Sequence, residues 1–125
     1  MNKRKGDEGQ AAAELALVLP LVALLLLAIV QLGLVVRDQI LVVHAAREAA
    51  RQAAVDPSPD ATRRAAVAGS GLAAGRLDVS VSGRAGPGSR VRVGVCYRDP
   101  TDVPLVGALV ADLTLKADVT MRVER

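Results

Sequence analysis

The chain has almost no aromatic residues: among its 125 residues there is one tyrosine and neither tryptophan nor phenylalanine. Proteins that bind single-stranded nucleic acid commonly stack bases on aromatic side chains, and such platforms are missing from this sequence. The formal net charge of +3 is too small to indicate a polyanionic partner. We therefore expect no nucleic acid among its partners.

Cysteine and histidine are equally scarce, with one residue of each, Cys96 and His44. A single cysteine cannot form an internal disulfide, although it could form an intermolecular one outside the cell. We expect Cys96 instead to be a small buried or half-buried side chain. A lone histidine without a second ligand at helical spacing predicts a solvated helix residue rather than a metal site. Residues 69–75 are glycine-rich but do not follow a strand into a helix, as a nucleotide loop would. These absences predict no metal, no cofactor and no enzymatic activity.

One long apolar stretch dominates the amino-terminal third of the chain. Within residues 15–36 only Gln31 is polar, and this stretch exceeds the roughly 20 residues that an α-helix needs to cross a bilayer. It is also longer than the apolar part of a cleavable secretory signal, which has about 7–15 residues. We expect a membrane-spanning helix, with release by cleavage near Ala46 as a less favoured alternative.

The charges that flank this stretch indicate its orientation. Three basic residues precede it, whereas the two residues that follow, Arg37 and Asp38, cancel each other. The excess of positive charge predicts a cytoplasmic amino terminus and an exported carboxyl-terminal part. The basic residues are Lys3, Arg4 and Lys5. The sequence thus predicts a single-pass protein of the cytoplasmic membrane.

Three residues inside the apolar stretch have a predicted role in helix geometry or packing. Pro20 removes the hydrogen bond to the Ala16 carbonyl and should kink the helix. Gln31 and Gly33 would supply a polar contact and a point of close approach between packed helices.

The residues that lead into the stretch form a second motif. A short polar leader ends at Gly9, Gln10 follows, and three alanines separate it from Glu14. A carboxylate in apolar surroundings is costly and usually has a partner, although Glu14 near the membrane edge could also extend to the lipid headgroups. The arrangement resembles a prepilin-type leader. That resemblance implies cleavage between Gly9 and Gln10 by a prepilin peptidase, and pairing of Glu14 with the freed α-amine of a neighbouring subunit, which would set the register between helices.

The helical pattern continues beyond the apolar stretch. Residues 37–55 contain neither glycine nor proline and are rich in alanine, so we expect one continuous helix over residues 10–55. Residues 10–36 would span the membrane and residues 37–55 would form an exported stalk. An apolar stripe on this stalk should pack against the rest of the chain, with charged residues largely off it. The stripe consists of Val36, Ile40, Val43, Ala46, Ala50 and Ala54.

Residues 56–125 predict a small exported α+β domain. Two prolines within residues 56–60 end the long helix, and a second short helix should begin at Pro59 or Asp60 and stop at the glycines of residues 69–75. Apolar and polar residues then alternate in three runs, at residues 77–82, 90–97 and 113–124, and a glycine-rich loop at 83–89 predicts a hairpin. We expect a three-stranded antiparallel sheet packed on the stalk. Residues 98–112 contain an apolar patch, which we expect in the core; a short helix on the outer leaflet or against a partner is the alternative.

Several of these features occur together and in order, and jointly they resemble a TadE-like protein. They are the leader ending at Gly9, the spacing to Glu14, LVLPLVALLLL at residues 17–27, AAREAAR at 45–51, the proline-containing segment before Leu105, and MRVE at 121–124.

The resemblance implies a minor pilin, or pseudopilin, of the tight-adherence type IVc pilus system, with residues 1–9 as the cleaved leader. It implies as partners the prepilin peptidase, the major and minor pilins, the inner-membrane assembly platform and the lipid bilayer. The chain departs from the major pilins, which are far shorter and favour an aromatic residue where Leu15 stands. The alternative function is a membrane-anchored envelope-binding module that keeps residues 1–9.

Overall fold

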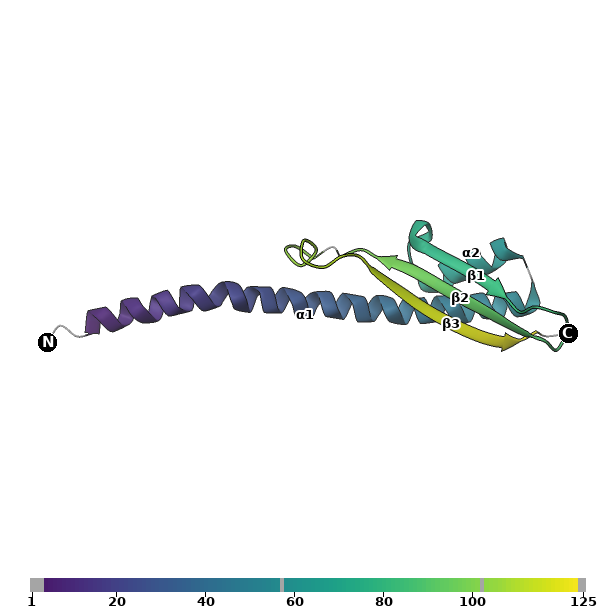
Figure 1. Ribbon diagram of the computed structural model, residues 1–125, viewed down its shortest axis with the longest axis horizontal. Coiled ribbons are helices and arrows are strands. Elements are labelled where there is room, and N and C mark those ends of the chain that lie inside the picture. Colours follow the sequence, from purple (N-terminus) through teal and green to yellow (C-terminus); the bar gives the residue numbers. More distant parts are fainter. Residues whose placement is uncertain (1–3, 57, 102, 124–125) are drawn as a thin grey trace. The chain divides into compact units, whose positions relative to one another are not determined.

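The computed structural model describes residues 4–56, 58–101 and 103–123, so Lys3, Pro57 and Glu124, which enter the predictions above, lie outside the described residues. Two α-helices are followed by a short 3-10 turn and three strands (Figure 1). The bounds are α1 Arg4–Val55, α2 Pro59–Ser70, η1 Ala74–Arg76, β1 Leu77–Ser82, β2 Arg90–Asp99 and β3 Leu113–Arg122. The α+β class and every predicted element are confirmed.

Helix α1 is a single helix of 52 residues, which confirms the prediction that one helix continues from the apolar stretch into residues 37–55. It begins at Arg4 and therefore includes residues that we assigned to the leader. The helix also continues through Pro20, whose ring cannot donate a hydrogen bond to the Ala16 carbonyl. After Val55, the Ser58 N–H donates to Asp56 Oδ1 at 2.9 Å. This local bond accompanies the turn into α2.

Helix α2 has a capping residue at each end. Ser58 is its N-cap, and Ser58 Oγ accepts a hydrogen bond from the Ala61 N–H at 3.4 Å. Gly71 follows the helix with φ 68°, and its N–H donates to the Val67 carbonyl at 3.0 Å. A left-handed residue at this position favours glycine, which explains where the helix ends.

The three strands form one antiparallel sheet in the order β1-β2-β3. In the register of the central strand, Val93 pairs with Val81 on one side and with Val119 on the other. Alternate residues of β2 are buried, and Val91, Val93 and Val95 are at most 1% exposed. The period of two in the sequence therefore identifies the core face of the sheet correctly.

The core lies between this face of the sheet and a face of α1 made largely of alanine. The buried residues of α1 belong to the same apolar cluster as the buried valines of β2, so the sheet packs on the stalk as predicted. The predicted stripe is only partly right, because Val36 and Ile40 are 52% and 54% exposed. Alanine pairs repeat every four residues here, so the buried face includes both members of each pair rather than one narrow line. Its buried side chains are Val42, Ala45, Ala46, Ala49, Ala50, Ala53 and Ala54.

The chain divides into two compact units, and the segment between β2 and β3 belongs to the first. One unit contains α1 as far as Gly33 together with Thr101–Ala111, and the other contains Leu34–Pro100 and the chain from Asp112 onward. Thr101–Ala111 forms hydrogen-bonded turns rather than a helix. Leu105 and Leu109 are 64% and 80% exposed. The prediction that this apolar patch lies in the core is therefore wrong, because the sheet and the alanine face already cover each other.

Candidate functional site

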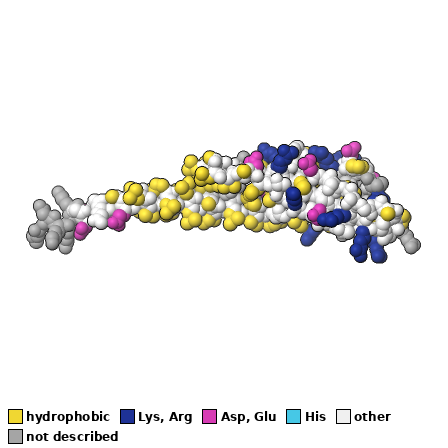
Figure 2. All heavy atoms as spheres, in the orientation of Figure 1, with side chains coloured by type: hydrophobic (Ala, Val, Ile, Leu, Met, Phe, Trp, Pro, Cys, Tyr) yellow, Lys and Arg dark blue, Asp and Glu magenta, His cyan; other side chains and the backbone are white. Residues whose placement is uncertain are grey.

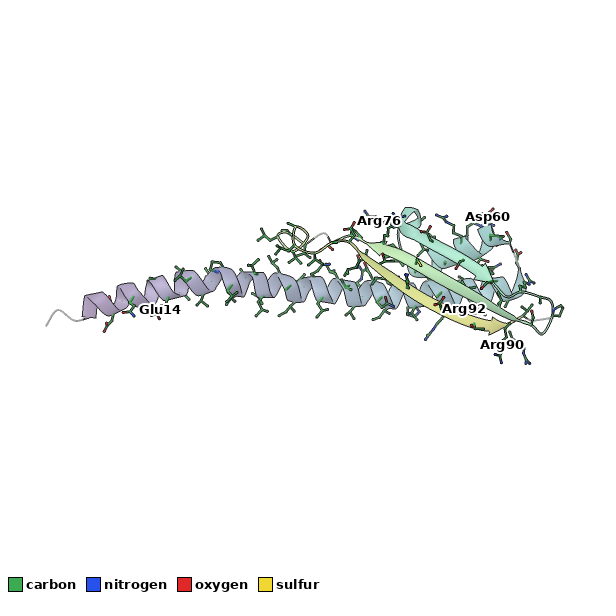
Figure 3. All side chains as sticks on the ribbon, viewed as in Figure 1. Glu14, Asp60, Arg76, Arg90 and Arg92 are labelled. Carbon is green, nitrogen blue, oxygen red and sulfur yellow. The ribbon has the colours of Figure 1, made fainter. Side chains whose placement is uncertain are left out.

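The candidate site is the amino-terminal end of α1, where Gly9, Gln10 and Glu14 lie within little more than one helical turn. Gln10 Nε2 donates to Glu14 Oε1 at 3.2 Å, and both side chains are exposed. These two residues line a shallow hollow together with Asp7 and Ala11. Figure 3 shows Glu14 projecting away from the helix. The carboxylate is thus accessible to a group from outside the chain.

Gly9 is exposed on α1, and a Cβ atom placed there would meet no atom within 4 Å. The same is true of Gly6, one turn earlier in the leader. Neither glycine is required by the packing of this chain. Any requirement for glycine at position 9 therefore comes from a molecule that binds it.

Most of the apolar part of α1 is exposed. Leu17, Leu21 and Leu25 are 80%, 69% and 60% exposed, and Figure 2 shows hydrophobic side chains along this part of the helix. By length and composition α1 can cross a membrane, with a mean hydropathy of 2.9 and only 6% of the most apolar window buried. A core helix of a soluble domain would be mostly covered, so the exposure of this surface is consistent with a membrane anchor.

Gln31 and Gly33 lie on different faces of α1. Gln31 is only 8% exposed and its Oε1 has no hydrogen-bond partner, whereas Gly33 is exposed and a Cβ there would meet no atom within 4 Å. Two residues correspond to about 200° of rotation in a helix of 3.6 residues per turn. The structure therefore does not bring the two together, and only Gly33 is open to a neighbouring helix.

The outer face of the sheet carries a group of arginines that sequence reasoning missed. Arg90 pairs directly with Arg122 across the two strands, a like-charge arrangement that is unfavourable unless an anion or solvent separates the charges. Arg92 lies two residues along β2, and its Nη2 is 3.4 Å from Asp118 Oδ2. Figures 2 and 3 show this basic surface. Only the register between β2 and β3 reveals the cluster, because its members are far apart in the sequence.

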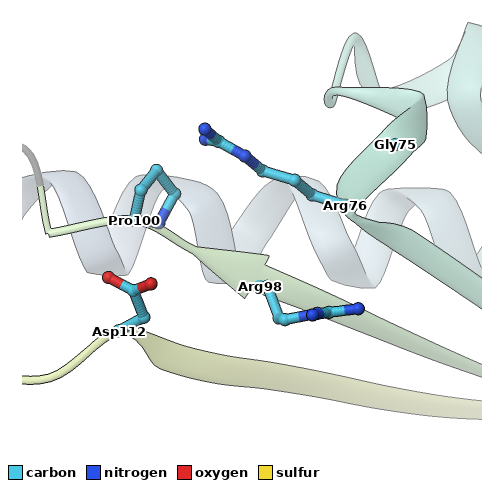
Figure 4. Close-up of a pocket in the computed structure, with 5 residues that line it drawn as sticks. All are labelled: Gly75, Arg76, Arg98, Pro100 and Asp112. Carbon is cyan, nitrogen blue, oxygen red and sulfur yellow. The ribbon is translucent and has the colours of Figure 1, made fainter.

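A small hollow lies at the other end of the sheet, between η1 and the end of β2. It is lined by Gly75, Arg76, Arg98, Pro100 and Asp112 and has a volume of about 220 Å³. In Figure 4 the guanidinium groups of Arg76 and Arg98 point in opposite directions. The two arginines therefore do not converge on one anion.

The sparse metal-binding residues are also spread out. Within the described part of the chain, no three His, Cys, Asp or Glu side chains come together. His44 is exposed on α1, and Cys96 is half-buried between Asp78 and Lys116 in the register of the sheet, as predicted for each.

The comparison with protein families finds a likeness in the amino-terminal part. A family model described as TadE-like protein matches residues 9–51. Over these residues the chain is similar to TadE-like proteins. The match begins at Gly9, includes Gln10 and Glu14, and ends at Arg51 in the stalk. The resemblance inferred from the sequence is confirmed over these residues.

The TadE-like match does not extend to the domain formed by α2 and the sheet. The likeness suggested by the segment before Leu105 and by residues 121–124 therefore stays an expectation. No curated protein and no solved structure matches the chain.

Proposed function

We propose that this protein is a minor pilin, or pseudopilin, of a tight-adherence type IVc pilus, matured by a prepilin peptidase between Gly9 and Gln10. The main support for the proposal is the position of the TadE-like match relative to the apolar part of α1. The TadE-like match begins at Gly9, and the exposed apolar helix begins immediately after Glu14. The proposed processing signal and a membrane-length helix would thus occur in the order that a prepilin requires.

Cleavage would place a positive α-amine on Gln10, four residues and roughly 6 Å along the axis from Glu14. In the full chain, one oxygen of Glu14 accepts a hydrogen bond from the neutral Gln10 amide at 3.2 Å. An ammonium group from a neighbouring subunit forms a stronger, charge-assisted bond with the carboxylate. Among apolar helices this pairing would be favoured, since an unpaired carboxylate is costly there. The pair would fix the axial offset between subunits.

Residues 10–36 would hold the subunit in the cytoplasmic membrane, with its amino terminus in the cytoplasm and the sheet exported. Pro20 would soften the helix locally and ease its exit from the bilayer into a fibre. The assembly platform, the peptidase and the other pilins are the expected partners. The stalk and sheet would select neighbours, so the role is structural rather than enzymatic.

The test replaces Glu14 in cells that carry the complete pilus system, with Glu8→Ala as the matched control. Both carboxylates are exposed on α1, but Glu8 lies in the leader and is removed by cleavage. We expect Glu14→Ala to keep wild-type membrane levels and lose pili, and Glu8→Ala to assemble normally. Normal piliation by Glu14→Ala would contradict the charge-register mechanism.

An anchored envelope-binding module that keeps residues 1–9 is the second candidate. It is favoured by one observation: α1 is helical from Arg4 through Gly9 and Gln10, whereas proteases prefer exposed, irregular backbone. In that case Gly9 could be replaced without consequence, and residues 1–9 would be retained in cells with an active peptidase.

A further inference from the structure

The turn segment Thr101–Ala111 presents an apolar surface that packing within the chain does not use. Leu105 and Leu109 are 64% and 80% exposed, and Val110 is 41% exposed. From Val103 to Ala111 the sequence contains no charged residue. Apolar side chains gathered this way on a short segment mark a contact with lipid or protein.

Hydrogen bonds hold the segment in a defined shape. Thr101 Oγ1 donates to the Ala111 carbonyl at 3.4 Å, and this bond joins the two ends of the segment. Inside it, the Val110 N–H donates to the Val106 carbonyl at 2.9 Å. The apolar side chains are therefore presented by a folded loop.

The backbone of the loop is strained at its tip. Leu105 has φ 67°, a left-handed conformation that is unfavourable for a leucine. Gly107 is packed so tightly that a Cβ there would overlap the Thr101 carbonyl oxygen. Strain of this kind persists only where the surrounding structure holds it in place, and it clusters at functional sites.

The loop shares its compact unit with the membrane-length part of α1. Figure 1 shows it beside α1. Gln31 is 8% exposed, although its neighbours Val30 and Leu32 are 55% and 63% exposed, so one face of the helix is covered at this level. Gln31 lies roughly 8 Å along the axis from Val36, the last apolar residue before Arg37. The loop thus lies just inside the end of the apolar stretch.

We propose that this loop inserts its exposed side chains Leu105, Leu109 and Val110 into the outer leaflet of the bilayer that α1 crosses, as a second anchor at the boundary between headgroups and acyl chains. The proposal rests on the membrane span of the proposed function. Interfacial apolar segments are buried about 5–10 Å into this boundary, which agrees with the level of Gln31. Two observations favour lipid as the partner of this loop: its position near the end of the apolar stretch of α1, and its lack of charged residues. Asp112, which follows the loop, is exposed and would stay in the headgroup layer.

Because the chain contains no tryptophan, one introduced tryptophan reports its own surroundings. The full-length Leu109→Trp protein would be reconstituted into phosphatidylcholine vesicles whose acyl chains carry bromine at shallow or deep positions, since bromine quenches tryptophan on contact. Leu25→Trp in the apolar stretch is the control for the span, and Thr120→Trp on the exposed face of β3 is the control for water. All three replaced side chains are exposed, so folding should be preserved.

We expect blue-shifted Leu109→Trp emission that shallow bromine quenches more strongly than deep bromine, quenching of Leu25→Trp by deep bromine, and no quenching of Thr120→Trp. If Leu25→Trp is quenched but Leu109→Trp is not, the loop proposal is overturned. Red-shifted emission from Leu109→Trp would then indicate contact with water, and blue-shifted emission would indicate contact with a second copy of the chain. Loss of quenching at Leu25→Trp instead refutes the membrane span, and with it the proposed function. The two failures are therefore distinguishable.

Discussion

At the scale of single residues, the sequence predicts the local geometry of the candidate site, because that geometry depends on helical spacing alone. Gly9, Gln10 and Glu14 are close along one helix, and helical spacing alone places Gln10 and Glu14 on the same face. The structure adds their hydrogen bond and the open surroundings of Gly9. Contacts between distant elements could not be foreseen in this way. Gly69 of α2 is the clearest case, since a Cβ there would lie 2.6 Å from Cγ of Glu48 on α1.

This close approach predicts that Gly69→Val destabilises the packing of α2 on α1. The added side chain would overlap the stem of Glu48, and overpacking of this kind costs about 1–3 kcal/mol. Unfolding of the full chain in detergent, followed by circular dichroism, measures the loss. Gly75→Val is the matched control, because a Cβ at Gly75 meets no atom within 4 Å. Equal stability of the two variants would show that α2 does not approach α1 at this point.

At the scale of elements, the period of the sequence predicts the strands and the helices well. The alternation in residues 90–97 and 113–122 gives both the strands and their buried faces, because a strand has only two faces. The alanine-rich stalk is harder, since alanine is compatible with a buried or an exposed position. The stripe drawn through Val36 and Ile40 therefore missed the buried Ala45, Ala49 and Ala53.

The alanine face predicts that the size of the side chain at position 49 controls how closely the sheet packs on α1. Ala49 is 0% exposed within the core cluster, so Ala49→Leu forces the sheet away from α1 at a cost of about 1–3 kcal/mol. Arg47→Leu adds a leucine to the same helix at an exposed position and should change stability by no more than about 0.5 kcal/mol. Denaturant titration of both variants in detergent measures the difference. A larger loss at position 47 than at 49 would contradict the assigned face.

At the scale of the whole molecule, the order of elements and the α+β class follow from the sequence because its period changes from helical to two after the prolines of residues 56–60. The position of the segment between β2 and β3 cannot be predicted from the sequence, because its hydrophobicity alone does not distinguish a core position from an exposed one. The structure leaves Leu105 and Leu109 exposed. This protein thus combines a TadE-like amino-terminal helix with a small domain whose core is closed without that loop.

The central claim is maturation between Gly9 and Gln10, and the most direct measurement is the intact mass and amino-terminal peptide of the protein from native membranes. Gly9→Val and Gly6→Val are the matched variants, since neither glycine has a neighbouring atom that a side chain would meet. The account predicts that the wild-type protein and Gly6→Val begin at Gln10 and that Gly9→Val keeps residues 1–9. A wild-type chain that retains residues 1–9 in cells with an active prepilin peptidase would contradict it.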